Sequence, residues 1–212
     1  MRPLKAHTGR GVTLRRSDVD TDQIIPAGYC KRLTKTGYAD GLFAGWRADP
    51  QFVLNQPAAA GASVLIGWHN FGTGSSREHA VWALRDGGFA AVIAVSFGDI
   101  FLRNAWKNGV PAVRLPAEAV SWLADRTEAD PSALITVDVA GREVRAGERR
   151  FPYPVDDRAR RLVLDGLDDM DLTLLAADRI AAYEHDRPYW LPRLSPDAVA
   201  NRLSRLTGPV PA

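Results

Sequence analysis

The chain of 212 residues is long enough to bury a sizeable core, and its 46% hydrophobic and 25% charged residues are those of an ordinary soluble globular protein. Its formal net charge of +2 is spread along the chain, which argues against a nucleic-acid surface, and we expect the densest basic stretch, 148–161, to be a solvated face. A single cysteine, Cys30, excludes an internal disulfide and any iron–sulfur site built by this chain alone.

The chain contains no apolar run near the roughly 20 residues that span a membrane. Residues 1–12 contain no apolar segment of the kind found in a secretory leader. We therefore expect a cytoplasmic protein that binds neither membrane nor nucleic acid.

Residues 1–60 contain a strand-like run at 11–16, an acidic loop at 18–27 and a long glycine-punctuated stretch. Residues 63–126 then alternate between apolar runs and segments with helical spacing. Strands are predicted at 63–68, 90–96 and 110–115, and helices at 76–86, 97–108 and 116–126. This alternation predicts parallel strands joined by crossover helices.

The remaining chain predicts a hairpin over 133–147, turning at Ala140-Gly141, and a mostly helical segment over 156–189. Six residues of that segment are available for a core: Leu162, Leu164, Leu167, Leu172, Leu175 and Ile180. After Pro188 the chain is proline-rich, which favours an extended arm or disorder. The fold class is therefore α/β with mixed strands.

The strongest candidate site is the run from Gly72 to Arg77, between a buried strand and a helix start. Free N–H groups at a helix N-terminus attract anions. Gly74 permits close backbone approach, while Ser75, Ser76 and Arg77 supply hydroxyls and a bidentate carboxylate fork. The alternative is plain capping, with Ser75 or Ser76 as the N-cap. The run lacks the patterns of a dinucleotide fingerprint, a P-loop and a hydrolase elbow.

A second candidate is the acidic run Asp18–Pro26. A calcium loop needs glycine at its sixth position and glutamate at its twelfth, and this chain has Gln23 and Tyr29 there, which argues against calcium. The run is either an acidic turn before a strand or a polar loop whose side chains orient other site groups. The orienting side chains would be those of Asp20, Thr21 and Asp22.

Two cations, Lys31 and Arg32, follow this loop; they are either ordinary exposed residues or a clamp for a second carboxylate. The four histidines show no metal-ligand spacing, so we expect structural or surface roles and no metal site. They are His7, His69, His79 and His185.

Four strings carry a family resemblance. NFGTGSSREHAVWAL resembles the signature of the aconitase-superfamily swivelling domain. DVDTDQIIPA, YCKRLTKTGYADGLFAGW and SFGDIFLRNAWKNG resemble, in that order, the small subunits of bacterial isopropylmalate dehydratases. The similarity covers about residues 5–192, and the ordered motifs make it specific for the superfamily.

The resemblance implies a swivelling β/β/α domain with a helical C-terminal extension over 1–192, and an extended or disordered tail over 193–212. It also implies a large partner subunit that holds a 4Fe–4S cluster, with the active site between the two subunits. Matched motif positions make Ser75 the catalytic base, and Arg77 a ligand of a substrate carboxylate with Ser76 beside it. Asp20, Thr21, Asp22 and Gly74 would line the site, and Lys31 or Arg32 would contact the second carboxylate.

The implied reaction is the dehydration and rehydration that interconverts 2-isopropylmalate and 3-isopropylmalate in leucine biosynthesis, a hydro-lyase activity that needs the large subunit. Two alternatives remain open. The chain is the small subunit of a related hydro-lyase acting on homoaconitate, citraconate or methylmalate, or it is a non-catalytic anion-binding subunit.

Overall fold

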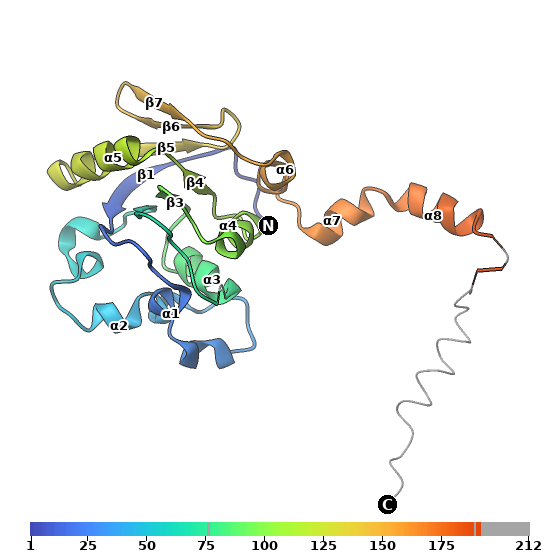
Figure 1. Ribbon diagram of the computed structural model, residues 1–212, viewed down its shortest axis with the longest axis horizontal. Helices are drawn as coiled ribbons and strands as arrows, with labels where there is room; N and C mark the ends of the chain where they lie inside the picture. The colour runs from blue at the N-terminus through green and yellow to red at the C-terminus, as the bar shows by residue number, and fades with distance from the viewer. Residues whose placement is uncertain (76, 189, 192–212) are drawn as a thin grey trace, which may run out of the picture. The chain divides into compact units, whose positions relative to one another are not determined.

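The computed structural model describes residues 1–75, 77–188 and 190–191, and within them seven strands form one sheet (Figure 1). The strands are β1 Ala6–Thr13, β2 Val64–Ile66, β3 Ala91–Ala94, β4 Ala112–Arg114, β5 Leu134–Asp138, β6 Glu143–Ala146 and β7 Arg149–Pro152. Their spatial order is β4-β3-β2-β1-β5-β6-β7; β1 to β4 are parallel, and β5 to β7 continue the sheet antiparallel. The predicted mixed α/β fold is confirmed.

The helices are α1 Thr21–Ile24, α2 Ala44–Arg47, α3 Glu78–Asp86, α4 Asp99–Lys107, α5 Ala117–Ala129, α6 Asp157–Asp165, α7 Asp169–Leu174 and α8 Ala177–His185. Four 3₁₀ turns lie in the long connection from β1 to β2: η1 Ala27–Lys31, η2 Ala39–Gly41, η3 Val53–Asn55 and η4 Pro57–Ala59. Helices α3 and α4 are the predicted crossovers between parallel strands. No helix of the described residues has both the length and the apolar character needed to cross a membrane.

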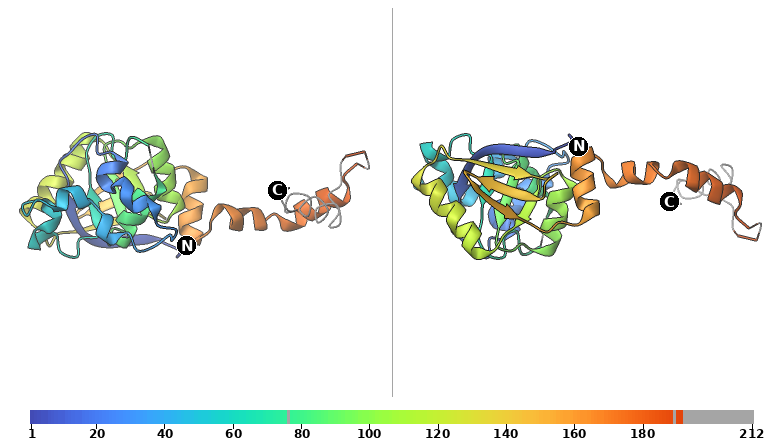
Figure 2. Two further views of the ribbon diagram at one scale, coloured as in Figure 1. Left: turned by 90° about the horizontal axis from the view of Figure 1, so that it is seen from below. Right: turned by 90° about the horizontal axis from the view of Figure 1, so that it is seen from above.

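Helix α5 touches both halves of the sheet. The hydroxyls of Thr13 in β1 and Thr127 in α5 are 2.8 Å apart, and the rings of Trp122 in α5 and Phe151 in β7 lie 5.6 Å apart between centroids. One helix reaches two strands that are separated by β5 and β6 because the sheet curls around it, as Figure 2 shows.

The sequence patterns account for most of the crossover half. Strands β2 and β3 are buried along their whole length, and the predicted apolar stripe of α3, formed by Ala80, Val81 and Leu84, is fully buried. The backbone of α3 ends at Gly87, where a glycine stop was predicted. Helix α5 begins at Ala117, with Pro116 as its N-cap, and continues three residues past the predicted end.

The structure differs from the predictions in three elements. Strand β1 begins at Ala6 rather than residue 11, because residues 6–10 pair with β5 across the sheet. Strand β7 lies inside the basic stretch predicted only as a solvated face. The acidic loop contains a one-turn helix, α1, instead of a simple turn before a strand.

The C-terminal helices form where predicted, but they contribute less core than expected. Leu162 of α6 is buried, whereas Leu175 and Ile180 are 62% and 40% exposed, so their predicted use in a core is wrong. The chain divides into two compact units, Met1–Met170 and Asp171–Ala212; Leu175 and Ile180 belong to the second, whereas the buried core residues lie in the first. The predicted tail, 193–212, lies outside the described residues.

Gly72, in the candidate loop, lies against an aromatic cluster that includes Phe71 and Phe101. The Phe71 and Phe101 rings are 5.5 Å apart between centroids, and both side chains are fully buried. A Cβ at Gly72 would come within 2.2 Å of the Phe101 ring, and the φ of Gly72 is +73°, in the left-handed region. The loop before α3 therefore requires glycine here for two separate reasons.

We predict that Gly72→Ala destabilises the chain more than Gly88→Ala. Gly88 also has a positive φ, +97°, but a Cβ there would meet no atom within 4 Å. Gly88→Ala is expected to lower the free energy of unfolding by about 1–2 kcal/mol, the cost of a left-handed non-glycine residue. Gly72→Ala is expected to add about 1–3 kcal/mol from overpacking against Phe101. Urea denaturation of both variants measures the difference, and equal losses would contradict the packing role.

Candidate functional site

The two candidate loops lie side by side, beyond the carboxyl ends of adjacent parallel strands. Strands β1 and β2 are paired through Thr13 and Ile66, so the segments that follow them emerge at the same edge of the sheet. The Gly72 N–H donates to the Val19 carbonyl at 2.7 Å, and the Thr21 N–H donates to the Thr73 carbonyl at 3.0 Å. Backbone hydrogen bonds therefore join residues that are about fifty positions apart in sequence.

Asp20 and Thr21 have defined roles in this junction. Asp20 is the N-cap of α1: its side chain accepts from the Gln23 N–H at 2.8 Å, and the Gln23 side chain accepts from the Asp20 N–H at 3.0 Å. Thr21 is fully buried, and its hydroxyl has no hydrogen-bond partner among the described residues. The predicted orienting loop is thus a capped turn attached to the glycine-rich loop.

Gly74 and Ser75 complete the loop before α3. Gly74 has a φ of +84°, and a Cβ there would lie 3.2 Å from the Asp20 Cβ, so glycine permits the close approach of the two loops. The Ser75 side chain is exposed. Ser76, the neighbour assigned beside the substrate, lies outside the described residues.

Ser75 is not the N-cap of helix α3, and Ser76, the other serine considered as a cap, lies outside the described residues. The N-cap of α3 is Arg77, which has extended backbone angles and provides no side-chain cap hydrogen bond. The capping interpretation of Ser75 is therefore not what the structure contains. The hydroxyl of Ser75 stays at the surface, just ahead of the positive end of a nine-residue helix.

Arg77 forms an ion pair with Asp22, which joins the start of α3 to α1. The two side chains are 29% and 51% exposed, so solvent screens the pair and its contribution to stability is small. The pair matters more for orientation, because the Asp22 carboxylate holds one nitrogen of the guanidinium, Nη1. Among the described residues, no other partner is found for the remaining N–H groups of the five-donor fork, so they can bind a second anion.

Arg32 and Lys31, the two candidate cations of the next loop, differ in the partners of their side chains. Arg32 donates to both oxygens of Asp40, at 2.8 and 2.7 Å, and its guanidinium lies 4.9 Å from the ring centroid of Tyr29. Those hydrogen bonds hold the pKa of the Asp40 carboxyl below its usual value. Lys31 is exposed and has neither an ion pair nor a hydrogen bond within the described part of the chain.

The loop that carries Lys31 and Arg32 packs against helix α3 through Tyr38. Tyr38, at the end of their loop, is fully buried, and its ring lies 5.5 Å from that of His79 between centroids. His79 lies four positions after Ser75 in the chain. Within the described residues, no hydrogen bond, ion pair or ring contact joins Lys31 or Arg32 directly to Ser75 or Arg77.

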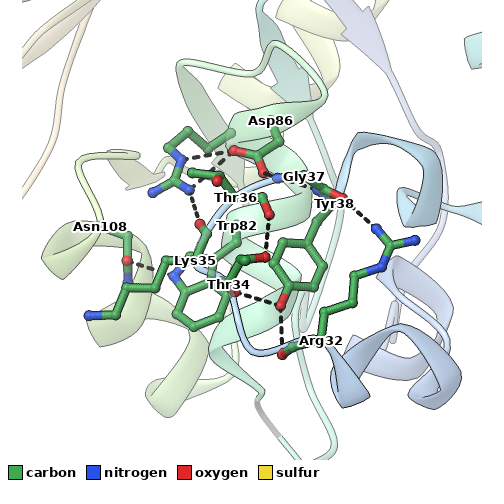
Figure 3. Close-up of polar contacts among 10 residues, drawn as sticks. Arg32, Thr34, Lys35, Thr36, Gly37, Tyr38, Trp82, Asp86 and Asn108 are labelled. Carbon is green, nitrogen blue, oxygen red and sulfur yellow. Dashed lines mark hydrogen bonds and ion pairs between the residues drawn. The ribbon is translucent and has the colours of Figure 1, made fainter.

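Two acidic residues of this region were not identified from the sequence. Asp40 pairs with Arg32, and Asp86, at the end of α3, accepts hydrogen bonds from the backbone of the 31–38 loop (Figure 3). Asp86 and its backbone partners are 48 and 49 positions apart. No local sequence signal reports such a contact.

Two of the histidines, His69 and His185, are exposed, and the other two, His7 and His79, have packed or hydrogen-bonded surroundings. His7 lies 2.7 Å from the Ser63 hydroxyl, and burial lowers its pKa, while His79 packs between Tyr38 and Trp82. Within the described residues, no three His, Cys, Asp or Glu side chains gather in a way that would hold a metal ion. With Cys30 as its one thiol, the chain does not have the ligands that a 4Fe–4S cluster requires.

The chain is similar to known proteins over most of its length. The family model described as the aconitase C-terminal domain matches residues 1–118. A 3-isopropylmalate dehydratase small subunit from Acidothermus cellulolyticus is 56% identical over 192 residues, covering 91% of this chain and 98% of the relative. The corresponding protein from Streptomyces griseus is 53% identical over 193 residues, with 91% and 98% covered.

The fold is also similar to a solved structure. The crystal structure of 3-isopropylmalate dehydratase from Methanocaldococcus jannaschii superposes with a TM-score of 0.60 at 27% identity, covering 84% of this chain and 99% of the other. The chain therefore belongs to the aconitase C-terminal domain family and, within it, to the 3-isopropylmalate dehydratase small subunits.

Proposed function

We propose that this chain is the small subunit of a cytoplasmic hydro-lyase that interconverts 2-isopropylmalate and 3-isopropylmalate in leucine biosynthesis. The observation that carries the proposal is the junction of the two candidate loops, which brings the capped acidic turn and the Gly74–Ser75 loop to one edge of the sheet. Curated relatives named as small subunits, at 51–56% identity over more than nine-tenths of the chain, support the same assignment.

Ser75 acts as the base in this proposal. Its deprotonated hydroxyl takes a proton from the carbon next to a substrate carboxylate, and the electron pair of that C–H bond forms the double bond as hydroxide leaves the neighbouring carbon. An alkoxide needs electrostatic stabilisation, which the N-terminus of α3 and the guanidinium of Arg77 supply. The exposure of Ser75 agrees with a group that meets its substrate at the surface of this chain.

Arg77 binds one carboxylate of the substrate. The contact with Asp22 leaves the other donors of the guanidinium available and restricts the rotation of its plane. A bidentate contact of this kind orients the neighbouring C–H bond toward Ser75, and orientation lowers the barrier to proton transfer. Ser76 is proposed beside this carboxylate from its place in the motif.

We assign the second carboxylate to Lys31 rather than Arg32. The guanidinium of Arg32 is already paired with Asp40 through two hydrogen bonds, whereas Lys31 has no such partner in the described part of the chain. Leu33, two positions further on, is fully exposed. A cation and an apolar side chain in one loop suit a substrate with a carboxylate and an isopropyl group.

The 4Fe–4S cluster belongs to the large subunit in this proposal. When bound there, it supplies Lewis acidity toward the departing hydroxyl. The single cysteine of this chain agrees with a partner-held cluster. The small subunit contributes the base and the carboxylate contacts, so each subunit alone has an incomplete site.

The test of the function is reconstitution. The purified chain is expected to be colourless and inactive, and adding a cluster-loaded large subunit should produce 3-isopropylmalate from 2-isopropylmalate. The complex should prefer isopropylmalate to citrate and homocitrate in kcat/KM, because a third carboxylate would be buried without a matching cation. The Cys30→Ser variant serves as the control and should keep the iron content of the complex. Hydration activity from the chain alone, or faster turnover of a tricarboxylate, would contradict the proposal.

Replacing Ser75 with alanine should reduce kcat by about 10²–10⁴-fold, the usual contribution of a general base. Substrate KM and subunit assembly should change little, since only proton transfer is lost. Ser17→Ala is the matched control, because Ser17 is an exposed serine next to the acidic run. Steady-state kinetics of the reconstituted complex measure both variants. A near-normal kcat for Ser75→Ala would assign the base to another residue.

Replacing Lys31 with methionine should raise KM by about 10–100-fold, the value of one hydrogen bond to a charged group. Lys35→Met removes an equally exposed lysine from the same loop and should leave KM unchanged. If Arg32→Met showed the large KM increase and Lys31→Met did not, the carboxylate contact would be assigned to Arg32.

A further inference from the structure

Asp86, in the last turn of α3, binds the backbone of the 31–38 loop through its carboxylate (Figure 3). One oxygen of its carboxylate accepts from the backbone N–H groups of Gly37 and Tyr38, at 2.8 and 3.1 Å. The other oxygen accepts from the Arg85 guanidinium at 3.1 and 3.2 Å. The side chain of Asp86 is only 14% exposed, so these hydrogen bonds are sheltered from solvent.

Hydrogen bonds within the 31–38 loop also restrain its backbone. The Tyr38 hydroxyl donates to the carbonyl of Thr34 at 2.7 Å, with the carbonyl of Arg32 at 3.2 Å, and the Thr34 hydroxyl donates to the carbonyl of Thr36 at 2.7 Å (Figure 3). Arg85 donates to the Lys35 carbonyl at 2.5 Å. Residues 31–37 are all exposed, yet hydrogen bonds restrain their backbone along most of its length.

Helix α3 therefore carries a site group at one end and an anchor at the other. Arg77 is the N-cap residue at its start, and Asp86 lies in its last turn. Nine residues of α-helix extend about 13 Å, and a helix is a rigid spacer over that length. Helix α3 and the contact at Asp86 therefore restrain the position of the Lys31 loop relative to the Ser75 loop.

We infer that Asp86 is a positioning residue, which holds the 31–38 loop so that Lys31 meets the second substrate carboxylate while Ser75 faces the reacting carbon. The inference rests on the proposed function, and Asp86 acts through Lys31 without touching the substrate. Gly37, with a φ of +89°, provides the sharp turn that presents two successive N–H groups to one carboxylate oxygen.

Asp86→Asn removes the carboxylate with almost no change in shape. An amide has one accepting oxygen, so its NH₂ must face either the two loop N–H groups or the Arg85 guanidinium, and both are donors. Asp138 is a matched control. It is 18% exposed, accepts from the backbone N–H of Gly141 at 2.7 Å, and pairs with Arg145 at 3.1 Å, but it lies in the β5–β6 hairpin.

The anchor itself is tested by amide hydrogen exchange on the full chain, without any substrate. Asp86→Asn should accelerate exchange at Gly37 and Tyr38 by about tenfold or more, because a buried acceptor is lost. Asp138→Asn should accelerate exchange at Gly141 and leave Gly37 and Tyr38 unchanged. Unchanged protection at Gly37 and Tyr38 in Asp86→Asn would overturn the anchor.

The positioning role is tested by kinetics of the reconstituted complex. Asp86→Asn should raise KM for isopropylmalate by about tenfold with a smaller effect on kcat. The substitution displaces the loop that carries Lys31, whereas Ser75 keeps its position. Asp138→Asn should leave both constants unchanged. The double variant Lys31→Met/Asp86→Asn should have the KM of Lys31→Met alone, because residues that act through one contact are not additive.

Two results would overturn the inference: an unchanged KM in Asp86→Asn, or additive KM increases in the double variant. Absence of turnover by the wild-type complex would reject the proposed function and the positioning role with it. That case is distinguishable, because exchange at Gly37 and Tyr38 would still accelerate in Asp86→Asn.

Discussion

The backbone hydrogen bonds between residues 18–21 and 69–73 are the constraint on which the site depends. Buried N–H and C=O groups must be paired, and here each loop satisfies the other. The pairing is possible because β1 and β2 are parallel neighbours and Gly72 and Gly74 adopt a positive φ. Without this junction, Asp22 would have no fixed position opposite Arg77.

Helix α3 connects this junction to the 31–38 loop. Its first residues meet the acidic turn through the Arg77–Asp22 pair, and its last turn holds the 31–38 loop through Asp86. The Arg77–Asp22 pair is partly exposed and adds little stability, whereas the Asp86 carboxylate is only 14% exposed. The two contacts orient the Arg77 guanidinium at one end of α3 and the backbone of the 31–38 loop at the other. A flexible linker in place of the helix would not fix these orientations.

On the proposed function, the exposure of the site explains the need for a second subunit. Ser75, Lys31 and Leu33 are all at the surface of this chain. An alkoxide in water is reprotonated, and a carboxylate in water is bound weakly, so the chemistry requires an enclosed site. A large subunit placed over this edge of the sheet would exclude water and complete the enclosure.

The sequence determined the features whose causes are local. Continuously apolar runs predicted β2, β3 and β4, the apolar stripe of Ala80, Val81 and Leu84 predicted α3, and Ala140-Gly141 predicted the β5–β6 turn. The glycine-rich run before α3 was identified for the same reason, because glycine spacing and a helix start are encoded in adjacent residues. The order of the motifs was enough to identify the family.

Only the tertiary structure decided the contacts between distant residues. The sequence did not indicate that Asp22 meets Arg77, that Arg32 is already paired with Asp40, or that Asp86 holds Gly37 and Tyr38. It also did not reveal β7 or the exposure of Leu175 and Ile180. The physical reason is common to all of these cases: local propensity depends on neighbouring residues, whereas pairing and burial depend on which surfaces the folded sheet brings together.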